Sequence, residues 1–442
     1  MFKIENKFSQ ELKKMGIEKI NDMQSSVFSS WKNEKDMILL SPTGSGKTLA
    51  FLLPILDKLS DKKKGIKLLI MVPARELAIQ IDKVVRQLFI DYKTTVCYGG
   101  HPVRVEKNNL KEVPDILIGT PGRLLDHLRR GNFELSSLDY IVVDEFDKLL
   151  ELGFKQELEA IFSEIPNNVQ KTLTSATNLK DEIPKYLKFR ASITTLDFLE
   201  ESSEIKLSSS FVRAEGVDKL AVLFELLCNC GSENTLVFCN HRDAVDRISE
   251  LLHIKGVYHD IFHGGLSQEE RERALIKFRN GSIKILLATD LASRGLDIPE
   301  IKNVIHYQLP SSESVYIHRN GRTARMHRSG QSILVLAKDD YKPEFIKEDI
   351  AEFPLKLNQD LPSLPEYSTI YLGGGKKDKI NKVDIVGFFC KQLEFENKDL
   401  GKIEVKDFHS FVAVKRIAYQ KSKKNINKFK IKKKTVKIQL SK

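Results

Sequence analysis

The segment Ser41–Thr48, with the sequence SPTGSGKT, has the residue types and spacing of a phosphate-binding loop. Gly44 and Gly46 let backbone N–H groups turn inward around an anion, Lys47 can reach the β and γ phosphates, and Thr48 can offer its hydroxyl to Mg²⁺. An apolar run precedes the loop and a helix-like stretch follows it, as such a loop requires. The sequence therefore predicts a nucleotide site made of Ser41, Pro42, Thr43, Gly44, Ser45, Gly46, Lys47 and Thr48.

A second set of chemical groups follows the apolar run Tyr140–Val143, where Asp144, Glu145, Phe146 and Asp147 come in succession. Carboxylates at the end of a buried strand are costly unless a cation or hydrogen bonds compensate them. Mg²⁺ would compensate Asp144 and leave Glu145 to orient or deprotonate the water that attacks a phosphate. The alternative is a solvated helix start, where acidic residues offset the helix dipole. The phosphate loop in the same half of the chain favours the metal.

The third set is HRNGRTAR, His318–Arg325, far downstream in the sequence. Helical spacing would put Arg322 and Arg325 on one face of a helix. Arginines inserted from another lobe stabilise charge on a transferring phosphoryl group. The alternative is a basic surface helix. We favour the catalytic role because the first half of the chain has no obvious arginine for it.

Short apolar runs alternate with helix-like stretches through two parts of the chain. Continuous rather than alternating hydrophobicity predicts strands that are covered on both faces, as in a parallel α/β sheet. The runs of the first part are Met37–Leu40, Lys67–Val72, Ile116–Ile118, Tyr140–Val143 and Thr172–Leu173. The runs of the second part are Thr235–Phe238, Asp260–Phe262, Ile283–Ala288, Val304–Tyr307 and Ile333–Leu336. Two such lobes suit a ligand that binds in the cleft between them.

The remaining segments suggest a linker, a small module and a tail. A polar stretch, Leu199–Ser210, is the predicted linker between the lobes. In the module, Thr369–Leu372 and Phe411–Val414 are predicted strands that flank an amphipathic helix near Val383–Leu393. From Gln420 onward lysines occur without clear periodicity, which predicts a disordered tail. We divide the chain into lobes at 1–203 and 204–363, an α+β module at 364–418 and a lysine-rich tail at 419–442.

The net charge of +11 is concentrated at the C-terminus. Residues 408–442 contain eleven lysines, one arginine and no acidic residue, so the residues before them carry a net charge of −1. We expect the tail to anchor the protein nonspecifically on nucleic acid. Five cysteines without C-x-x-C spacing predict a reduced, cytoplasmic protein without structural zinc. No apolar run reaches the roughly 18 residues of a membrane span, and we expect no signal peptide.

Together these segments resemble the DEAD-box RNA helicases of superfamily two over nearly all of Gly16–Leu336. In that family the two lobes are RecA-like domains, and the substrates are ATP and RNA. The further motifs stand in the family's order and are GIEKINDMQ (Gly16–Gln24), PARELA (Pro73–Ala78), Gly99 with Gly100, TPGR (Thr120–Arg123), SAT (Ser175–Thr177), LVFCN (Leu236–Asn240), HGGLSQEER (His263–Arg271) and ATDLASRGLDIP (Ala288–Pro299).

The resemblance implies a role for each of these motifs. The residues implied to catalyse ATP hydrolysis are Lys47, Thr48, Asp144, Glu145, Arg322 and Arg325, with Thr48 and Asp144 as the ligands of Mg²⁺. Besides the phosphate loop, the residues implied to bind ATP are Gln24, at adenine, and Asp297. The residues implied to hold the RNA backbone are Pro73, Arg75, Gly100, Thr120, Gly122, Arg123, Thr289, Arg294 and Gly295. The residues implied to couple hydrolysis to strand separation are Asp147, Ser175, Thr177 and His318, with Ser175 and Thr177 bonded to Asp147.

Several residues depart from the family pattern. Phe146 replaces the alanine of the eponymous tetrapeptide, which predicts activity with altered local packing. Ile20 stands where the family has proline, and Ala324 replaces a glycine. For the aromatic residue that stacks on adenine, Phe2 is a candidate, whereas Phe8 shares a helical face with apolar residues and is expected in the core.

The C-terminal module resembles the RNA-binding domain of the DbpA subfamily, an RRM variant that directs the helicase to a hairpin of large-subunit ribosomal RNA. The segments that carry this resemblance are Ile370–Ile380 and Leu400–Arg416. His409 and Ser410 do not fit the general RRM signature, so no base-stacking role is assigned there. The alternative is a module that only packs against the rest of the protein.

The resemblance implies an RNA-stimulated ATPase that unwinds RNA locally, with a role in ribosome assembly, and we expect it to act as a monomer. Two other functions remain open. One is an ATP-gated RNA clamp or chaperone without productive unwinding, which Phe146 keeps open. The other is a DNA helicase of the same superfamily, against which the RRM-like module argues.

Overall fold

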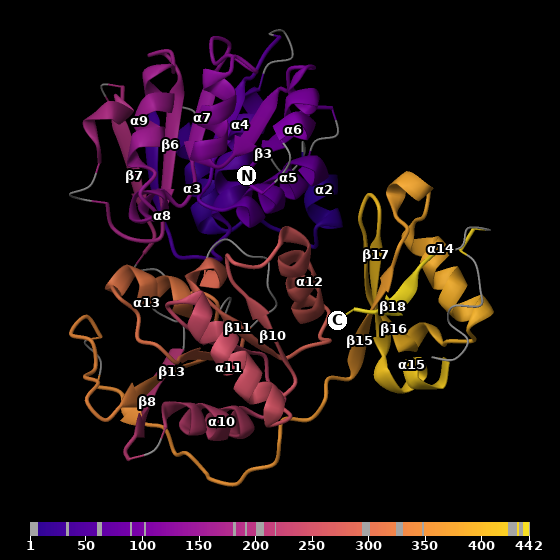
Figure 1. The fold of residues 1–442 in the computed structure, drawn as a ribbon. Coiled ribbons are helices and arrows are strands. Elements are labelled where there is room, and N and C mark those ends of the chain that lie inside the picture. The colour runs from indigo at the N-terminus through magenta and orange to yellow at the C-terminus, as the bar shows by residue number, and fades with distance from the viewer. Residues whose placement is uncertain are drawn as a thin grey trace. The chain divides into compact units, whose positions relative to one another are not determined.

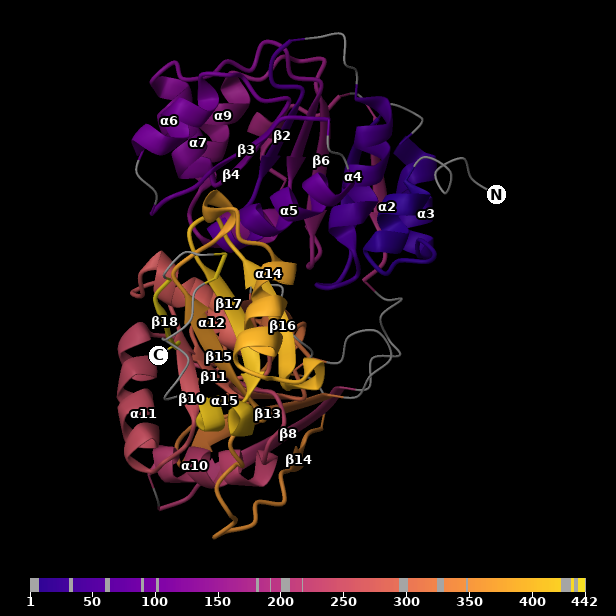
Figure 2. The ribbon, with the colours of Figure 1, turned by 90° about the vertical axis from the view of Figure 1, so that its right-hand side faces the viewer.

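The computed structural model describes residues 8–31, 35–59, 64–88, 91–100, 103–179, 183–190, 192–199, 207–216, 218–293, 301–323, 330–346, 349–422, 431–432 and 436–441. Two compact units make up the chain. The first covers residues 1–205 together with 293–296, and the second covers the remainder. Figures 1 and 2 show the elements of each unit from two directions.

The first unit contains a sheet of seven parallel strands in the order β3-β4-β2-β5-β6-β1-β7. The strands are β1 Asp36–Leu40, β2 Leu68–Met71, β3 Thr94–Cys97, β4 Ile116–Gly119, β5 Tyr140–Val143, β6 Gln170–Ser175 and β7 Ile193–Asp197. All five predicted strands are present. The sequence missed β3 and β7, which lie at the two edges of the sheet and are rich in threonine, because the search relied on continuous apolar runs.

Helices cover both faces of this sheet. The helices are α2 Ser9–Lys14, α3 Asp22–Trp31, α4 Lys47–Lys58, α5 Arg75–Leu88, α6 Val103–Leu110, α7 Pro121–Arg129, α8 Phe146–Glu151 and α9 Lys155–Ser163, with a 3₁₀ turn at Lys185–Leu187. Met37 and Leu39 pack with α3, α4 and α5, while Ile38 and Leu40 pack with α7, α8 and α9. Figure 2 shows the two helical layers on opposite sides of the strands. Continuous apolar runs thus follow from burial on both faces. Phe8 is buried in the first of these cores, as predicted.

The second unit begins with another sheet of seven parallel strands, in the order β10-β11-β9-β12-β13-β8-β14. Its strands are β8 Leu207–Ala214, β9 Thr235–Phe238, β10 His259–Phe262, β11 Ile285–Ala288, β12 Asn303–His306, β13 Gly330–Ala337 and β14 Ala351–Glu352. Its helices are α10 Lys219–Cys230, α11 Arg242–Ile254, α12 Gln268–Arg279 and α13 Glu313–Asn320, with a 3₁₀ turn at Asp290–Ser293.

The linker prediction was wrong at its C-terminal end. Leu207–Ser210 is not a connection but the first half of β8, which pairs with β13 along its full length. Serines 208 to 210 made the segment look polar. On the side away from β13, β8 pairs only with the short β14, and its serines are exposed or half-buried. Such a strand near the edge of a sheet tolerates polar residues.

A third sheet, in the C-terminal module, has four antiparallel strands in the order β16-β17-β15-β18. The elements are β15 Tyr367–Leu372, α14 Lys382–Gly387, a π-helix at Phe388–Gln392, β16 Leu400–Val405, β17 Ser410–Lys415, α15 Arg416–Ser422 and β18 Ile438–Leu440, with 3₁₀ turns at Lys376–Asp378 and Asn397–Asp399. The two predicted strands and the helix between them are confirmed.

The expectation of a wholly disordered tail from Gln420 was wrong. Ile438–Leu440 forms β18, which pairs with β15. Ile431 and Ile438 are buried in the core of the module. These few apolar residues give no clear pattern in the sequence because lysines surround them. They become part of the core only when the chain packs on the module and β18 pairs with β15.

The predicted fold class, two parallel-sheet RecA-like domains followed by a small α+β domain, is confirmed. The domain boundaries at 203, 363 and 418 stay predictions. Among the residues that the structure describes, none of the helices combines the length and the apolar character that a membrane crossing needs.

Candidate active site

The phosphate loop connects the buried strand β1 to helix α4, which starts at Lys47. Gly44 and Gly46 have φ values of +87° and +93°, a region that favours glycine. The ammonium of Lys47 lies 2.5 Å from the carbonyl oxygen of Ser41 and 3.0 Å from that of Pro42. The loop is therefore curled around its own lysine, with the start of α4 beside it, as an anion site requires.

Gln24 and Asn21 hold the loop from outside. The side-chain amide of Gln24 donates to the carbonyl of Gly46 at 3.2 Å, and Asn21 Nδ2 donates to the carbonyl of Ser45 at 2.9 Å. A Cβ atom on Gly46 would lie 2.6 Å from Gln24 Nε2, so a side chain at this position would force Gln24 out of its hydrogen bond with the loop. Asn21 is a contact that sequence reasoning missed, although it stands inside the motif Gly16–Gln24.

Asp144 follows β5 and is almost fully buried, 3% exposed. Burial raises its pKa, which the hydrogen bond from Thr174 and the charge of Lys47 partly oppose. Thr174 Oγ1 donates to Asp144 Oδ1. Since β6 lies next to β5 and β1 lies next to β6, the carboxyl ends of these strands bring Asp144, Thr174 and the phosphate loop to one edge of the sheet.

Glu145 and Phe146 follow Asp144 at the start of α8. Glu145 has φ +52°, unusual for a residue with a side chain, and its backbone N–H donates to Thr174 Oγ1 at 3.2 Å. Phe146 is fully buried in the core between the sheet and α7, α8 and α9. The bulky ring therefore packs in the core, and Asp144 has its hydrogen bond from Thr174 beside it.

The predicted coupling residues lie together in part. Thr177 Oγ1 donates to Asp147 Oδ2 at 2.9 Å. Ser175 Oγ instead donates to the backbone carbonyl of Thr177 at 2.7 Å, so it reaches Asp147 only through Thr177. This chain of contacts joins the end of β6 to the start of α8.

The residues expected at RNA in the first unit follow β3, β4 and β2, the three neighbouring strands on the other side of β5 in the same sheet. Pro73 and Arg75 follow β2, Gly100 follows β3, and the segment Thr120–Arg123 follows β4. A Cβ atom on Gly100, at φ +89°, would lie 2.5 Å from Arg75 Nη1. The backbone N–H of Thr120 donates to the carbonyl of Cys97 at 3.1 Å, which ties the ends of β3 and β4. The residues expected to bind the nucleotide and those expected to bind RNA thus lie side by side, at the carboxyl ends of the strands of one sheet.

In the second unit, three of the expected residues are described. Thr289 follows β11, and its backbone N–H donates to the carbonyl of Phe262 at 3.2 Å. His318 and Arg322 are both buried. The expectation that Arg322 lies on a helix was wrong, because α13 ends at Asn320 and Gly321 caps it. Four of the expected site residues lie outside the described residues, namely Arg294, Gly295, Asp297 and Arg325. Phe2 and Ala324, named above as departures from the family pattern or as a candidate, also lie outside them.

Arg319 is a residue of the motif His318–Arg325 that sequence reasoning passed over. It is fully buried and makes a bidentate pair with Asp290, with atom separations of 2.6 and 3.1 Å. It also donates to the carbonyl of Gln308 and to Asn240 Oδ1. One arginine therefore joins three motifs of the second lobe, and its place inside the motif His318–Arg325 was the signal available in the sequence.

In the C-terminal module, Tyr371, His409 and Phe411 cluster on the sheet. The ring centroids of Tyr371 and His409 are 5.7 Å apart, and those of His409 and Phe411 are 5.2 Å apart. Phe411 is only 4% exposed, so its ring is not available to stack on a base in this structure. Lys406 and His409 contact Glu272 of α12, and although burial raises the pKa of Glu272, these contacts lower it to about 2.

Three protein families match the chain in succession. They are the DEAD/DEAH box helicases at residues 21–183, the helicase conserved C-terminal domain at residues 218–327 and the DbpA RNA binding domain at residues 369–440. Among solved structures, Saccharomyces cerevisiae Dbp5 bound to RNA and ADP BeF3 is 27% identical with a TM-score of 0.65, covering 75% of this chain and 87% of that one. Mss116p bound to ssRNA and AMP-PNP is 27% identical with a TM-score of 0.68, covering 77% of this chain and 73% of that one.

Two curated relatives match the full length. The ATP-dependent RNA helicase DbpA of Escherichia coli (strain K12) is 31% identical, and the alignment covers 98% of this chain and 96% of that protein. The protein of the same name from Bacillus subtilis (strain 168) is 30% identical over 93% of both chains. With the phosphate loop, the carboxylates after β5 and the C-terminal module all in the family's order, the chain belongs to the DEAD-box ATP-dependent RNA helicases, in the DbpA subfamily.

Proposed function

We propose that this RNA helicase remodels large-subunit ribosomal RNA during ribosome assembly, by binding a hairpin through its C-terminal module. ATP-dependent RNA helicase activity belongs to the family. The observation that supports the narrower target is the match of residues 369–440 to the DbpA RNA binding domain, within relatives that align over nearly the whole chain. Action as a monomer in the cytoplasm remains our expectation.

For the nucleotide, the residues fit ATP with Mg²⁺. Lys47 and the backbone N–H groups from Gly44 to Thr48 would hold the phosphates, and Gln24 would contact adenine. The glycine cradle at Gly46 supports this fit, because a Cβ there would meet Gln24. Mg²⁺, when bound, would offset phosphate charge, and Thr48 with Asp144 would hold it. The raised pKa of Asp144 fits a carboxylate that a cation would compensate.

Glu145 would orient the attacking water as a general base. Its backbone is held by Thr174 and by Asp144 Oδ1, which supports a fixed direction for the side chain. Arg322 and Arg325 of the second unit, with Asp297, would complete the site when ATP and RNA bind together. Such arginines stabilise charge on the transferring phosphoryl group.

The RNA backbone would lie along the first unit's segments at Pro73, Arg75, Gly100 and Thr120–Arg123, and along Thr289, Arg294 and Gly295 of the second unit. Contacts to the RNA backbone carry no sequence information, so specificity for one RNA would come from the C-terminal module. Asp147, Thr177, Ser175 and His318 would transmit the state of the nucleotide to the RNA. Binding would bend one strand and release its partner over a few base pairs.

A displacement assay tests the proposal. The substrate is a short RNA duplex attached to a ribosomal hairpin, and the matched control is the same duplex attached to an unrelated hairpin of equal length. We expect ATP-dependent displacement and ATPase stimulation at lower concentrations of the ribosomal substrate. Equal use of both hairpins would contradict the ribosomal target. Displacement of a DNA duplex at the same rate would favour a DNA helicase, and ATPase without displacement would favour an RNA clamp.

A further inference from the structure

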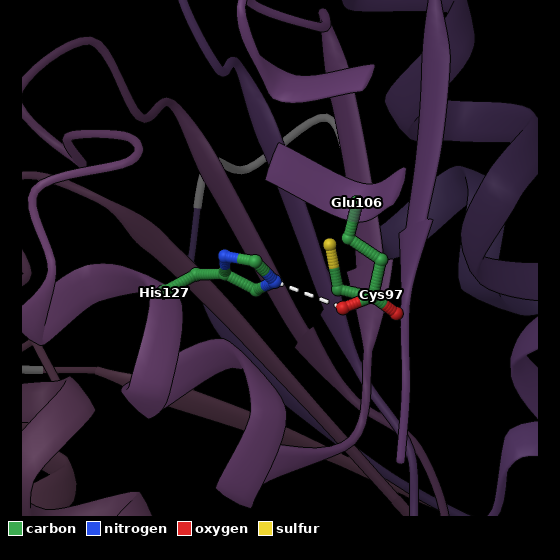
Figure 3. A group of neighbouring side chains, drawn as sticks. All are labelled: Cys97, Glu106 and His127. Atoms are coloured by element: carbon green, nitrogen blue, oxygen red, sulfur yellow. Dashed lines mark hydrogen bonds and ion pairs between the residues drawn. The ribbon is translucent and has the colours of Figure 1, made fainter. Parts of the chain in front are cut away.

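Glu106 on α6 is a buried carboxylate that belongs to none of the motifs found in the sequence. It is 2% exposed. Its Oε1 accepts the backbone N–H of Tyr98 at 2.9 Å, and its Oε2 lies 2.9 Å from His127 Nε2 and 3.4 Å from Arg123 Nε. Figure 3 shows His127 facing Glu106, with Cys97 beside them. Arg123 and His127 are four residues apart on α7 and share a face. One carboxylate therefore joins the end of β3 to the first two turns of α7.

The hydrogen bonds around His127 have a defined direction. Asn132 Nδ2 lies 2.9 Å from His127 Nδ1, and since an amide nitrogen can only donate, Nδ1 accepts. The ring proton is then on Nε2, where it points at Glu106. The carboxylate thus accepts from the backbone N–H of Tyr98 and from Nε2 of His127, and it faces the guanidinium of Arg123, which balances its charge. A buried carboxylate with hydrogen-bond or ion-pair partners on both oxygens holds those partners in place.

A metal ion is the other use that this cluster suggests, since ligand atoms of Cys97, Glu106 and His127 lie within 4.8 Å of one another. The contacts argue against it. Both oxygens of Glu106 and both ring nitrogens of His127 already have protein partners. Burial and the charge of Glu106 raise the pKa of Cys97 to about 12, which favours the thiol over the metal-binding thiolate. A guanidinium beside the cluster would repel a cation.

The partners of Glu106 lead directly to the residues expected to bind RNA in the first unit. Tyr98 precedes the turn at Gly99 and Gly100, and Gly100 approaches Arg75 closely. Arg123 closes the segment that begins at Thr120. Glu106 therefore contacts two separate loops, the one after β3 and the one after β4, and links them.

We propose that Glu106 is a positioning residue for RNA binding, which orients the guanidinium of Arg123 and fixes the turn at Gly100. This proposal rests on the proposed RNA contacts of those two residues. The ion pair between Arg123 Nε and Glu106 restrains the guanidinium, and a restrained guanidinium favours a directed contact with a phosphate. Without the carboxylate, the charge of Arg123 loses its buried partner and the N–H of Tyr98 loses its acceptor.

The main variant is Glu106→Gln. Its amide can still accept from Tyr98 through Oε1, but it presents an N–H group to His127 and Arg123 where the carboxylate had an acceptor. We expect the RNA concentration for half-maximal ATPase to rise about tenfold. The kcat at saturating RNA and the KM for ATP should stay within about twofold. Glu112→Gln, an exposed glutamate just after α6, is the matched control and should change none of these values.

A double-mutant cycle with Arg123→Ala separates this proposal from the proposed function. We expect Arg123→Ala to weaken RNA binding and Glu106→Gln to have no further effect in that background, because the two act through one contact. If Arg123→Ala weakens binding while Glu106→Gln does not, or if the two effects add, the positioning role is wrong and the RNA contact stands. If Arg123→Ala has no effect, the assigned RNA contact itself is wrong.

Two further measurements keep the test decisive if Glu106→Gln does not fold. Glu106→Asp keeps the charge but withdraws it by one methylene, so it should raise the half-maximal RNA concentration above the wild-type value, by less than about tenfold, and leave the KM for ATP unchanged. A shift in the KM for ATP equal to that for RNA would indicate a general structural defect and overturn the proposal. Elemental analysis of the purified wild-type chain would also overturn it, if it finds stoichiometric zinc that Cys97→Ala removes.

Discussion

At the scale of single residues, the chemistry depends on a few charged groups whose surroundings are mostly buried. Asp144 and Glu145 follow one strand but differ in environment. Asp144 accepts a hydrogen bond from Thr174 and senses the charge of Lys47, while Glu145 caps the start of α8 in a left-handed conformation. Phe146, the departure from the family pattern, packs into the core. We therefore expect the catalytic groups to act as they do in a helicase with alanine at that position.

The first prediction concerns Glu145. Glu145→Gln should lower the kcat of the RNA-stimulated ATPase by about 100-fold to 10,000-fold, the range that general acid–base groups contribute. Binding of ATP should change little, because the amide keeps the size of the side chain. Steady-state ATPase and a titration with a fluorescent ATP analogue measure the two effects. Glu134→Gln, an exposed glutamate, is the control. ATPase unchanged from wild type would remove Glu145 from the mechanism.

The second prediction concerns His306, a buried histidine of β12. Burial, together with the charge of Arg319, lowers its pKa to about 3. The neutral ring is then favoured in the folded protein, so its contribution to stability is full above the unfolded pKa of about 6.5 and is lost as the pH falls toward 3, at up to about 1.4 kcal/mol per pH unit. Side-chain NMR of ¹³C-labelled histidine should show no titration of His306 between pH 7 and 5. A midpoint near 6.5 would contradict the burial argument.

At the scale of elements, the residues proposed for ATP and for RNA in the first unit follow strands of one parallel sheet. The loops after β1, β5 and β6 carry the residues proposed to bind the nucleotide, and the loops after β2, β3 and β4 carry those proposed to bind RNA. Parallel strands place all these loops on the same side, which is where α/β sheets bind ligands. Gln24 of α3 lies close against the phosphate loop, since a Cβ atom on Gly46 would be 2.6 Å from its Nε2.

The third prediction tests that close approach. Gly46→Ala would place a Cβ 2.6 Å from Gln24 Nε2 at a φ of +93°. We expect the affinity for ATP to fall about tenfold to 100-fold, since the loop must shift away from its hydrogen bonds to phosphate. Gly131→Ala is the matched control, because Gly131 also has a positive φ but no atom lies near its Cβ position. It should cost roughly 1 kcal/mol of stability and leave ATP binding unchanged. Equal ATP affinity in both variants would show that the contact with Gln24 is unimportant.

At the scale of the whole molecule, the positive charge is segregated at the C-terminal end, and the fold decides how much of it is available. Lys432 Nζ lies 2.9 Å from Asp384 Oδ2, and Lys415 Nζ lies 3.0 Å from Glu366 Oε1. Because β18 is the edge strand of the sheet, deleting the chain from Gln420 would remove this strand and its buried Ile438 together with the charges. Substitution of lysines is therefore a better test than truncation.

The fourth prediction concerns this charge. Replacing Lys423, Lys424, Lys428 and Lys430 with glutamine should reduce the slope of log K against log salt for single-stranded RNA by about 3, at roughly 0.7 for each phosphate that a lysine no longer neutralises. Replacing Lys415 and Lys432, which are already paired with carboxylates, should change the slope less. Binding titrations at four or five salt concentrations measure both. An unchanged slope in the fourfold variant would show that the segment does not contact the RNA backbone.

The sequence by itself determined the fold class and the family and predicted the residues of the nucleotide site, because these depend on local patterns. A buried strand shows as an apolar run, and a phosphate loop is contiguous, with its glycines and lysine at set spacings. The same patterns failed for β3, β7, β8 and β18, whose strand character comes from pairing with distant strands.

Only the tertiary structure decided how the separate motifs meet. The contacts of Thr174 with Asp144, of Arg319 with Asp290, and of Glu106 with Arg123 join residues that are 17 to 30 positions apart. Nothing in the spacing of those residues predicts such contacts, since they depend on the order of strands in the sheet. The phosphate loop and carboxylates could thus be found by reading the chain, whereas the buried partners that orient them required its folding.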